Sequence, residues 1–593
     1  MASTVTSPPT SRGLSDELYL GRLRWDLLRP FPTQDAEDRR IGDATVSALR
    51  DLLREHVDPA VVDQTRQLPE ELPELLRQGG FFGLTIAAEF GGLALSPMNA
   101  LRVVEVAASW SPAVAWMLAI SNGLGSGCYL PLLDEGPLRE LVLAAVRAGA
   151  ISGSADTEVG GAANSGRATT AVPVEDGAAY LISGEKIFIG NAPLAGLVDV
   201  SAKVEHDGVE QIRIFFVPTD SPGVRVASRQ DFMGLHGASM GVLRFDQVRV
   251  PAEQLLPASN DQWRDEPELV RLAVLGRMLI IASPSLAIAK LCLAWSKEFV
   301  NRRVMDGRPL GEYDEIQRLV AQTAADVFAI ESITQWGLLS GDLADKAPEL
   351  TAAKNLTSVA CWRVVDRTMS LLGGEGFETA LSKARRGTTP LPVERFARDA
   401  RGLRIAGGVD FLLDYWTALA AIDAGYRQPD STPPAPEPAA KAVEDEPQDD
   451  ASLSPRCREH LAHVRAESRA LAELCGRLTR QYGVDALAEQ EHRLVLIGRI
   501  GTALLGMAVV LARAAHLADQ GNTVALDLAD IACTEAAKDL AGLWPQLTDD
   551  PQPDYAAMSA RVLGSDQMNF LLDGVITDLP PYGSIGEPAA TDD

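Results

Sequence analysis

Histidine and cysteine are among the residues in this sequence that could bind a metal ion, and cysteine could also form a disulfide. His460 and His463 lie one helical turn apart, but no carboxylate or thiolate accompanies them in a metal-ligand pattern, so we interpret the pair as part of a solvated helix face. The six cysteines are scattered and form no CxxC pair, which indicates free thiols in a reducing compartment. We therefore predict no metal site and a cytoplasmic protein.

The charge of the chain excludes two classes of partner. The formal net charge is −27, which repels nucleic acid and anionic membrane surfaces. The N-terminal sequence MASTVTSPPTSRG has no basic patch followed by an apolar stretch, so we expect no signal peptide. The weakly charged run 494–512 carries Arg499 and several small residues, and we predict a buried bundle helix there rather than a membrane span.

Hydrophobic spacing divides the chain into helical and β-rich parts. Apolar residues recur every three or four positions from about 44 to 148, whereas 150–255 contains short alternating runs separated by Asp, Gly and Pro. We predict a mostly α, α+β fold. Its parts are an N-terminal extension (1–43), an N-terminal helical domain (44–149), a middle β-domain (150–256), a helical bundle domain (257–427), an acidic Pro-rich linker (428–452), an additional C-terminal helical domain (453–570) and a tail (571–593).

Seven local motifs occur in an order that is typical of one protein family. They are FFGLTIAAEFGGLALS (81–96), SADTEVGGAANSG (154–166), GEKIFIGNA (184–192), FMGLHGASMGVLRFDQVRVP (232–251), RRVMDGRPLGE (302–312), LLGGEGF (371–377) and PVERFARDARGLRIAGG (392–408). Together they resemble the acyl-CoA dehydrogenase family over nearly all of 44–427. The segment 507–540 resembles the extra C-terminal domain of the very-long-chain type, and this resemblance implies a homodimer.

The resemblance implies a chemistry and its participants. It implies an FAD-dependent oxidoreductase that acts on an acyl thioester, carried by CoA or by an acyl-carrier protein, with an electron-transfer flavoprotein as a candidate partner. Dehydrogenation of a thioester needs a base for the α-proton, a flavin to accept the β-hydride and hydrogen bonds that acidify the α-carbon.

The family motifs assign contacts to the flavin ring residue by residue. Thr157 matches the Thr that contacts the ring, and Phe188 replaces the Trp that packs behind it. Gly190 replaces a Thr that donates a hydrogen bond near flavin N5, and Gly408 replaces the Thr of the E-G-T loop. The resemblance therefore predicts FAD binding with some ring-side donors lost.

The adenosine side of the flavin is assigned in the same way. Arg303 matches the Arg that pairs with the flavin pyrophosphate across the dimer interface, where a guanidinium suits phosphate oxygens. Ser370 replaces a Gln, while Gly373 and Gly374 keep a tight turn that lets the backbone approach the ligand.

The catalytic base is missing from both positions that the family uses. The stretch aligned with Y/F-E-G-T is Ile405-Ala406-Gly407-Gly408, and Ala406 cannot accept a proton. A minority of the family takes the Glu from an earlier helix, and the residue aligned with that position is Arg277, which is always protonated.

Three explanations for the missing base remain open. Another carboxylate serves, either Asp410 or Glu375, although Asp410 also matches a common non-catalytic acid of the family. Alternatively, Arg277 anchors a charged substrate group or an enolate-like oxygen, as in a flavin-dependent oxygenase built on the same fold. In the third explanation the chain is a non-catalytic homologue that binds flavin or thioester, or pairs with an active subunit. The sequence does not identify the acyl chain.

Two further segments depart from the family pattern. An insertion near 379–391 carries Lys383, Arg385 and Arg386. We interpret it as a solvated loop, with a contact for CoA phosphates or an acidic carrier protein as the alternative. The linker 428–452 has one lysine, Lys441, among many acidic residues, so we expect it to avoid anionic lipid.

Overall fold

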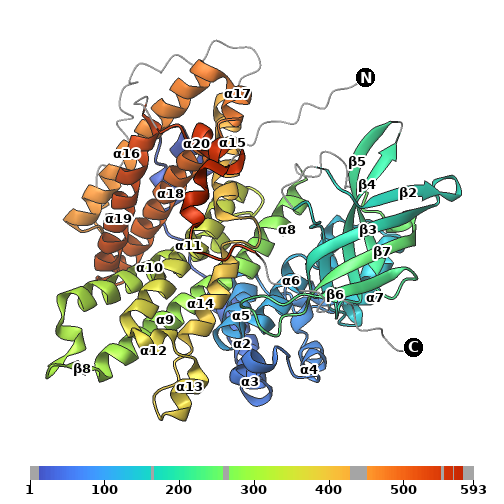
Figure 1. Cartoon of the computed structure of the whole chain (residues 1–593), viewed down its shortest axis with the longest axis horizontal. Helices are drawn as coiled ribbons and strands as arrows, with labels where there is room; N and C mark the ends of the chain where they lie inside the picture. Colours follow the sequence, from blue (N-terminus) through green and yellow to red (C-terminus); the bar gives the residue numbers. More distant parts are fainter. Residues whose placement is uncertain are drawn as a thin grey trace. The chain divides into compact units, whose positions relative to one another are not determined.

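The computed structural model describes residues 12–161, 166–206, 208–257, 266–427, 450–548, 553–564 and 566–578. Residues Met1–Leu540 form one compact unit, and Ala541–Asp593 form a second. In the first unit, helices precede and follow a seven-stranded sheet (Figure 1). The predicted mostly α, α+β fold is confirmed.

The helices before the sheet begin earlier than the sequence spacing suggested. They are α1 (Leu14–Tyr19), α2 (Ala36–His56), α3 (Pro59–Thr65), α4 (Leu72–Gln78), α5 (Pro97–Trp110), α6 (Pro112–Gly123) and α7 (Pro137–Arg147). Helix α2 begins at Ala36 because the Asp35 carboxylate accepts hydrogen bonds from the backbone N–H groups of Glu37 and Asp38. The predicted boundary between 43 and 44 falls inside this helix and stays a prediction.

The sheet combines parallel and antiparallel pairs. Its strands are β1 (Ser152–Ala155), β2 (Thr170–Val174), β3 (Ala179–Gly190), β4 (Leu197–His206), β5 (Val209–Pro218), β6 (Val224–Arg229) and β7 (Met240–Pro251). Their order is β1-β4-β2-β3-β7-β6, with β5 paired to β4. The alternation read from the sequence puts Ile182, Val200 and Phe245 into one buried cluster, whereas Leu197 and Phe216 pack with residues of α7 in another.

A long helical rod follows the sheet. Helix α8 (Pro267–Arg277) continues through a π-helical turn (Met278–Ala282) into α9 (Ser283–Arg302). The bundle is completed by α10 (Asp314–Leu339), α11 (Ala347–Leu372), α12 (Gly374–Phe377), α13 (Ala380–Arg385), α14 (Val393–Leu403) and α15 (Asp410–Tyr426). All five residues of the π-helical turn are buried, and such turns are frequent at functional sites.

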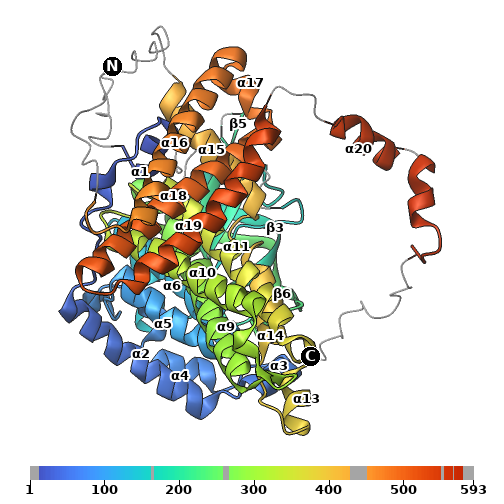
Figure 2. The ribbon, with the colours of Figure 1, turned by 90° about the vertical axis from the view of Figure 1, so that its left-hand side faces the viewer.

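The C-terminal helices up to Leu540 belong to the same compact unit as the bundle. They are α16 (Pro455–Tyr482), α17 (Val484–Ala488), α18 (Glu491–Asp519) and α19 (Val524–Leu543). Helix α18 packs against α10, α11 and α15, as Figure 2 shows for α10 and α18. The short helix α1 is also part of this packing, because Ser468 on α16 donates a hydrogen bond of 2.7 Å to the Leu18 carbonyl. The remaining predicted domain boundaries stay predictions.

The second unit contains α20 (Tyr555–Gly564) and a 3-10 helix (Asp566–Leu572). Most of its described apolar side chains, including Leu563 and Ile576, are exposed. Most of the predicted linker, residues 428–449, and the end of the predicted tail lie outside the described residues.

Two residues predicted to be exposed to solvent, His460 and Lys383, are buried. His460 is buried, and its Nε2 lies 2.6 Å from Asp530 Oδ1, so the predicted solvated face is wrong at this residue: α19 brings a carboxylate from far along the chain. The insertion contains a short helix, α13, whose Lys383 is fully buried and donates to the Glu375 carbonyl at 2.7 Å. A solvated loop is therefore the wrong description of Lys383.

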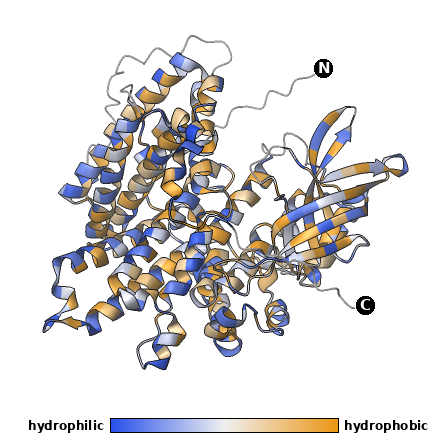
Figure 3. Cartoon of the chain, viewed as in Figure 1, coloured by the Kyte–Doolittle hydropathy of each residue, from blue (hydrophilic) through white to orange (hydrophobic). Residues whose placement is uncertain are grey.

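The long apolar helices lie inside the protein. Two helical stretches, Pro267–Arg302 and Glu491–Asp519, are long and apolar enough to cross a membrane by length and composition, but their apolar windows are 83% and 78% buried. This agrees with the buried helix predicted for 494–512. Along α16 and the strands, hydrophilic and hydrophobic residues alternate (Figure 3). All six cysteines are free and buried.

Candidate functional site

The loop between α14 and α15 contains the residues aligned with the family's catalytic motif. Ala406 is half-buried there, and it is followed by two glycines with positive φ, Gly407 at 69° and Gly408 at 105°. A Cβ on Gly408 would also come within 2.8 Å of Leu413 Cδ2. The loop therefore requires glycine at 408, which explains why a threonine cannot occupy that position.

Two cations hold this loop by its carbonyl groups. Arg277, the last residue of α8, donates from Nε to the Gly407 carbonyl oxygen at 3.3 Å. Lys354 on α11 donates from Nζ to the Gly408 carbonyl at 2.6 Å. Burial lowers the pKa of Arg277, and burial lowers the pKa of Lys354 to about 8. Ala406 and Arg277, which occupy the two positions where the family places its catalytic base, therefore lie at the same loop.

Positive charge at the loop is incompletely balanced. Among the described residues, Arg277 forms no ion pair. Asp410 is at the loop, but its carboxylate accepts hydrogen bonds from Arg404, including one from Nε at 2.9 Å. Partial burial raises the pKa of Asp410, but the hydrogen bond and charge of Arg404 outweigh it and hold the pKa below its usual value. A partly buried cation without an ion-pair partner, as Arg277 is, attracts an anionic group.

Glu375 does not belong to this site. It lies beyond the C-terminal end of α11, where it forms ion pairs with Arg302 at 2.7 Å and Arg303 at 3.7 Å. From Lys354 to Leu372 the helix rises about 27 Å at 1.5 Å per residue. The prediction that Glu375 could act as the base beside Ala406 is therefore wrong, because α11 separates the Gly turn from the 404–408 loop.

Glu375 is part of a second group that contains the predicted adenosine-side residues. Arg303 is half-exposed at the end of α9, and the Gly373 N–H donates to the carbonyl of exposed Ser370 at 3.2 Å. A Cβ on Gly373 or Gly374 would meet no atom within 4 Å. This turn therefore leaves space for a ligand to approach the backbone.

The two residues predicted to face the flavin ring are adjacent. The Ile187 N–H donates to the Thr157 carbonyl at 2.9 Å. The register of β3 against β7 is irregular between Lys186 and Ile189, and Phe188 within this bulge has φ 57°. Its side chain is 51% exposed although it is a large apolar residue. The bulge redirects an aromatic ring out of the sheet.

A buried ion pair fixes the segment that carries Thr157. Glu158 Oε1 lies 2.8 Å from Lys186 Nζ, and its carboxylate also accepts the backbone N–H groups of Ala168 and Thr169. Burial raises the pKa of Glu158, but these hydrogen bonds outweigh it and lower the pKa to about 2. Glu158 therefore holds the loop after β1 against β3.

Gly190 explains how one predicted donor is lost. A Cβ at Gly190 would overlap Ile120 Cδ1, so α6 fills the space that a threonine side chain would need. Helix α6 ends at Gly123, which packs closely against Gly276, the neighbour of Arg277. A Cβ added at Gly123 would lie only 2.8 Å from the Cα of Gly276. The sequence motifs did not identify Ile120, yet α6 connects the ring-side strand to Arg277.

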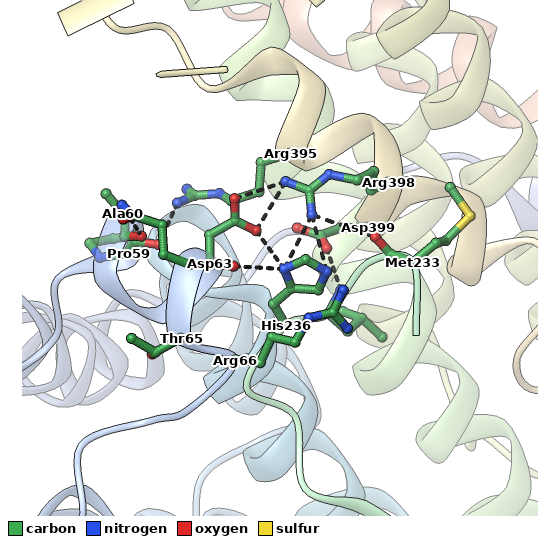
Figure 4. A network of polar contacts seen from close by, with 12 residues as sticks. Pro59, Ala60, Asp63, Thr65, Arg66, Met233, His236, Arg395, Arg398 and Asp399 are labelled. Carbon is green, nitrogen blue, oxygen red and sulfur yellow. Dashed lines mark hydrogen bonds and ion pairs between the residues drawn. The ribbon is translucent and has the colours of Figure 1, made fainter. Parts of the chain in front are cut away.

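A polar network ties the β-domain to the helix that leads into the Ala406 loop (Figure 4). Asp63 on α3 contacts His236 Nδ1 at 2.9 Å and Arg398 Nη2 at 2.9 Å. The Leu235 N–H donates to Asp399 on α14 at 2.5 Å, and burial raises the pKa of Asp399 to about 6. Sequence reasoning identified both motifs but not this contact, because its members come from three distant segments.

Comparison with known proteins agrees with this arrangement. Models of the acyl-CoA dehydrogenase N-terminal, middle and C-terminal domains match residues 43–136, 153–248 and 273–411 in that order. The chain belongs to the acyl-CoA dehydrogenase family. A probable acyl-CoA dehydrogenase of Mycobacterium tuberculosis, FadE10, is 33% identical over 419 residues, which cover 69% of this chain and 63% of that protein.

Other members of the family extend the comparison. The very long-chain specific acyl-CoA dehydrogenase of Rattus norvegicus is 26% identical over 431 residues, 70% of this chain and 64% of that protein. The chain thus matches less than two thirds of either relative's length. A crystal structure of an acyl-CoA dehydrogenase complexed with FAD from Bacillus anthracis has a TM-score of 0.70 at 20% identity, covering 90% of this chain and 91% of that one. The C-terminal helices are therefore largely part of a fold shared with that family member.

Proposed function

We propose that this acyl-CoA dehydrogenase family member is an FAD-dependent oxidoreductase that acts on an acyl thioester, with CoA or an acyl-carrier protein as the carrier. The observation that carries the proposal is the convergence of the ring-side strand, through Ile120 and α6, with the loop that contains Ala406. The name of FadE10 supports CoA thioesters. A structural neighbour described as a prolyl acyl carrier protein oxidase, at 16% identity, shares the fold.

The residues present fit a flavin. The exposed ring of Phe188 and the adjacent Thr157 provide a surface for the isoalloxazine. Half-exposed Arg303 and the open turn at Gly373 suit a pyrophosphate and its nucleoside. When bound, FAD supplies the acceptor for a hydride from the substrate β-carbon.

The chain's own residues contribute mainly electrostatic stabilisation. Arg277 and Lys354 place positive charge at the loop, where negative charge develops on the thioester oxygen as the α-proton leaves. Asp410 is the carboxylate of the loop, and we assign it as the candidate base. Its bond to Arg404 lowers its pKa and makes it a weak base. Slow deprotonation follows from this arrangement.

The end of the bundle near Arg303 suits a second copy of the chain. Val304, Met305 and Phe377 are exposed there, with Phe377 83% exposed. We propose a homodimer in which this end approaches the pyrophosphate and adenosine half of a flavin whose ring is bound by the other copy. An electron-transfer flavoprotein is the proposed electron acceptor, and the six buried free thiols support a reducing, cytoplasmic location.

Ala406 and Arg277 also favour a second candidate function. A homologue that binds flavin or thioester without dehydrogenating it needs no base, and neither family position supplies one. In this case Arg277 serves as an anchor for an anionic group of the ligand.

An anaerobic spectroscopic titration tests the proposal. The purified full chain is expected to be yellow, and one member of a butyryl- to palmitoyl-CoA series is expected to bleach its flavin absorbance. Bound flavin that no CoA or carrier-protein thioester bleaches would support the second candidate instead. A colourless protein that cannot be reconstituted with FAD would overturn flavin binding, and NAD(P)H-dependent oxygen uptake would indicate an oxygenase.

A further inference from the structure

A second cavity lies away from the Ala406 loop. It has a volume of about 360 Å³ and lies among the segment before α2 and helices α2, α5, α9, α10 and α18; Figure 2 labels all five helices. This volume falls in the range of about 300–1,000 Å³ that is common for small-molecule sites. Along the rod of α8 and α9, Lys290 in this cavity lies about 20 Å from Arg277. None of the cavity residues belongs to the candidate flavin site.

The cavity walls contain a continuous charged network. Lys290 Nζ lies 2.9 Å from Glu105 Oε1 and 2.8 Å from Glu331 Oε1. Glu331 in turn lies 2.5 Å from Arg513 Nη2 on α18. These two cations and two carboxylates neutralise one another, so the network is a rigid polar wall and not the source of ligand charge.

Two further arginines line the cavity, and only one of them lacks an ion-pair partner among the described residues. Arg102 is positioned by hydrogen bonds to the Asn99 side chain at 3.0 Å and the Arg39 carbonyl at 3.2 Å. Arg102 also forms an ion pair with Asp43, which lies outside the lining and balances its charge. Arg39, an exposed residue at the rim of the cavity, forms no ion pair within the described part of the chain. With Asp43 included, four cations face three carboxylates, an excess of one positive charge in a protein whose net charge is −27.

Apolar residues complete the cavity. Met98 on α5, Leu286 on α9, Leu339 on α10 and Leu517 on α18 contribute to its lining. The combination is a cavity of mixed polar and apolar lining with one arginine, Arg39, free of an ion pair, which suits an amphipathic anion.

We propose that this cavity is a second ligand site, which binds a small organic anion with an apolar body, its carboxylate or phosphate head on Arg39 and Arg102. The ligand joins the segment before α2 to the bundle and to α18. Its binding therefore stabilises the whole first unit, and it does so without any contact with the flavin site.

Isothermal titration calorimetry of the full chain with sodium octanoate tests the site. Octanoate has the anionic head and apolar body, and neutral 1-octanol is the matched probe without charge. Octanoate is expected to bind at one site and 1-octanol at least tenfold more weakly. The double variant Arg39→Gln/Arg102→Gln is expected to weaken octanoate by about tenfold or more, as for loss of a charge-assisted hydrogen bond. Arg40→Gln, a neighbouring exposed arginine outside the cavity, is the control and is expected to bind octanoate as the unmodified chain does.

A steric variant keeps the test independent of charge. Leu339→Trp is expected to fill the cavity and abolish octanoate binding, while circular dichroism reports an intact fold. Absence of octanoate binding, equal binding of 1-octanol, or binding that survives both the double arginine variant and Leu339→Trp would overturn the proposal. The last result would place octanoate in the acyl site instead.

Discussion

Arg277 donates a hydrogen bond from Nε to the carbonyl oxygen of Gly407, the residue that follows Ala406. The two places from which this family draws its base are therefore neighbours in this chain, one occupied by a methyl group and the other by a cation. A positive charge where the family has a carboxylate changes which step of the reaction the site assists. Arg277 would stabilise the negative charge that forms on the thioester oxygen, while proton removal is left to Asp410, a weaker base.

Restoring the carboxylate should restore proton removal. Ala406→Glu is expected to accelerate anaerobic bleaching of the flavin by a cognate acyl-CoA by about 100-fold, the lower end of what a positioned general base contributes. Stopped-flow absorbance measures the rate. Ile405→Glu, which adds the same charge at an exposed neighbour, serves as the control and should leave the rate within a few-fold. An unchanged rate in Ala406→Glu would mean that proton removal does not limit the reaction.

Neutralising Arg277 should slow the chemical step more than it weakens binding. Arg277→Gln removes charge where negative charge develops, so the bleaching rate is expected to fall by about 100-fold, with a much smaller change in the Kd for the thioester. Arg271→Gln on the same helix, at an exposed residue near Glu268, should change neither quantity. Equal losses in rate and affinity would instead indicate that Arg277 anchors a group already charged in the substrate.

The sequence predicted the elements of this site better than their grouping. The alternation of β3 and the helical spacing of α8 and α11 follow from local hydrophobic patterns, and the motif order located the Ala406 loop. Glu375 and Asp410 looked equivalent as carboxylates near glycines. In the structure they lie at opposite ends of α11, so only Asp410 is close to the Ala406 loop. The spacing of residues along the sequence does not show which end of a helix packs against a given loop. Likewise, Lys354 and Ile120 carry no motif and become visible only through contacts between distant segments.

The effects of substitutions at Gly190 and Ile120 on stability should depend on each other, because the two residues are in direct contact. Gly190→Thr forces a side chain onto Ile120 and is expected to destabilise the fold by about 1–3 kcal/mol. In Ile120→Ala/Gly190→Thr the threonine has room, so part of that stability should return and the flavin absorbance maximum should shift as a ring-side donor is added. Urea unfolding and visible spectra measure the two effects. Additive destabilisation with an unshifted spectrum would show that Gly190 does not border the flavin.

The buried pair of Glu158 and Lys186 should make the β-domain sensitive to acid. The pKa of Glu158 lies at about 2 in the fold against 4.5 for the free side chain. A lowered pKa stabilises the fold above the unfolded value, so this contribution is lost as the pH falls from about 4.5 towards 2. Glu158→Gln leaves the Lys186 ammonium buried without its counterion and is expected to cost about 3–5 kcal/mol at neutral pH. In Glu158→Gln/Lys186→Met most of this loss should be recovered, because no buried charge remains. Urea unfolding at a series of pH values measures both effects, and a single variant as stable as the unmodified chain would show that the ion pair does not hold the segment around Thr157.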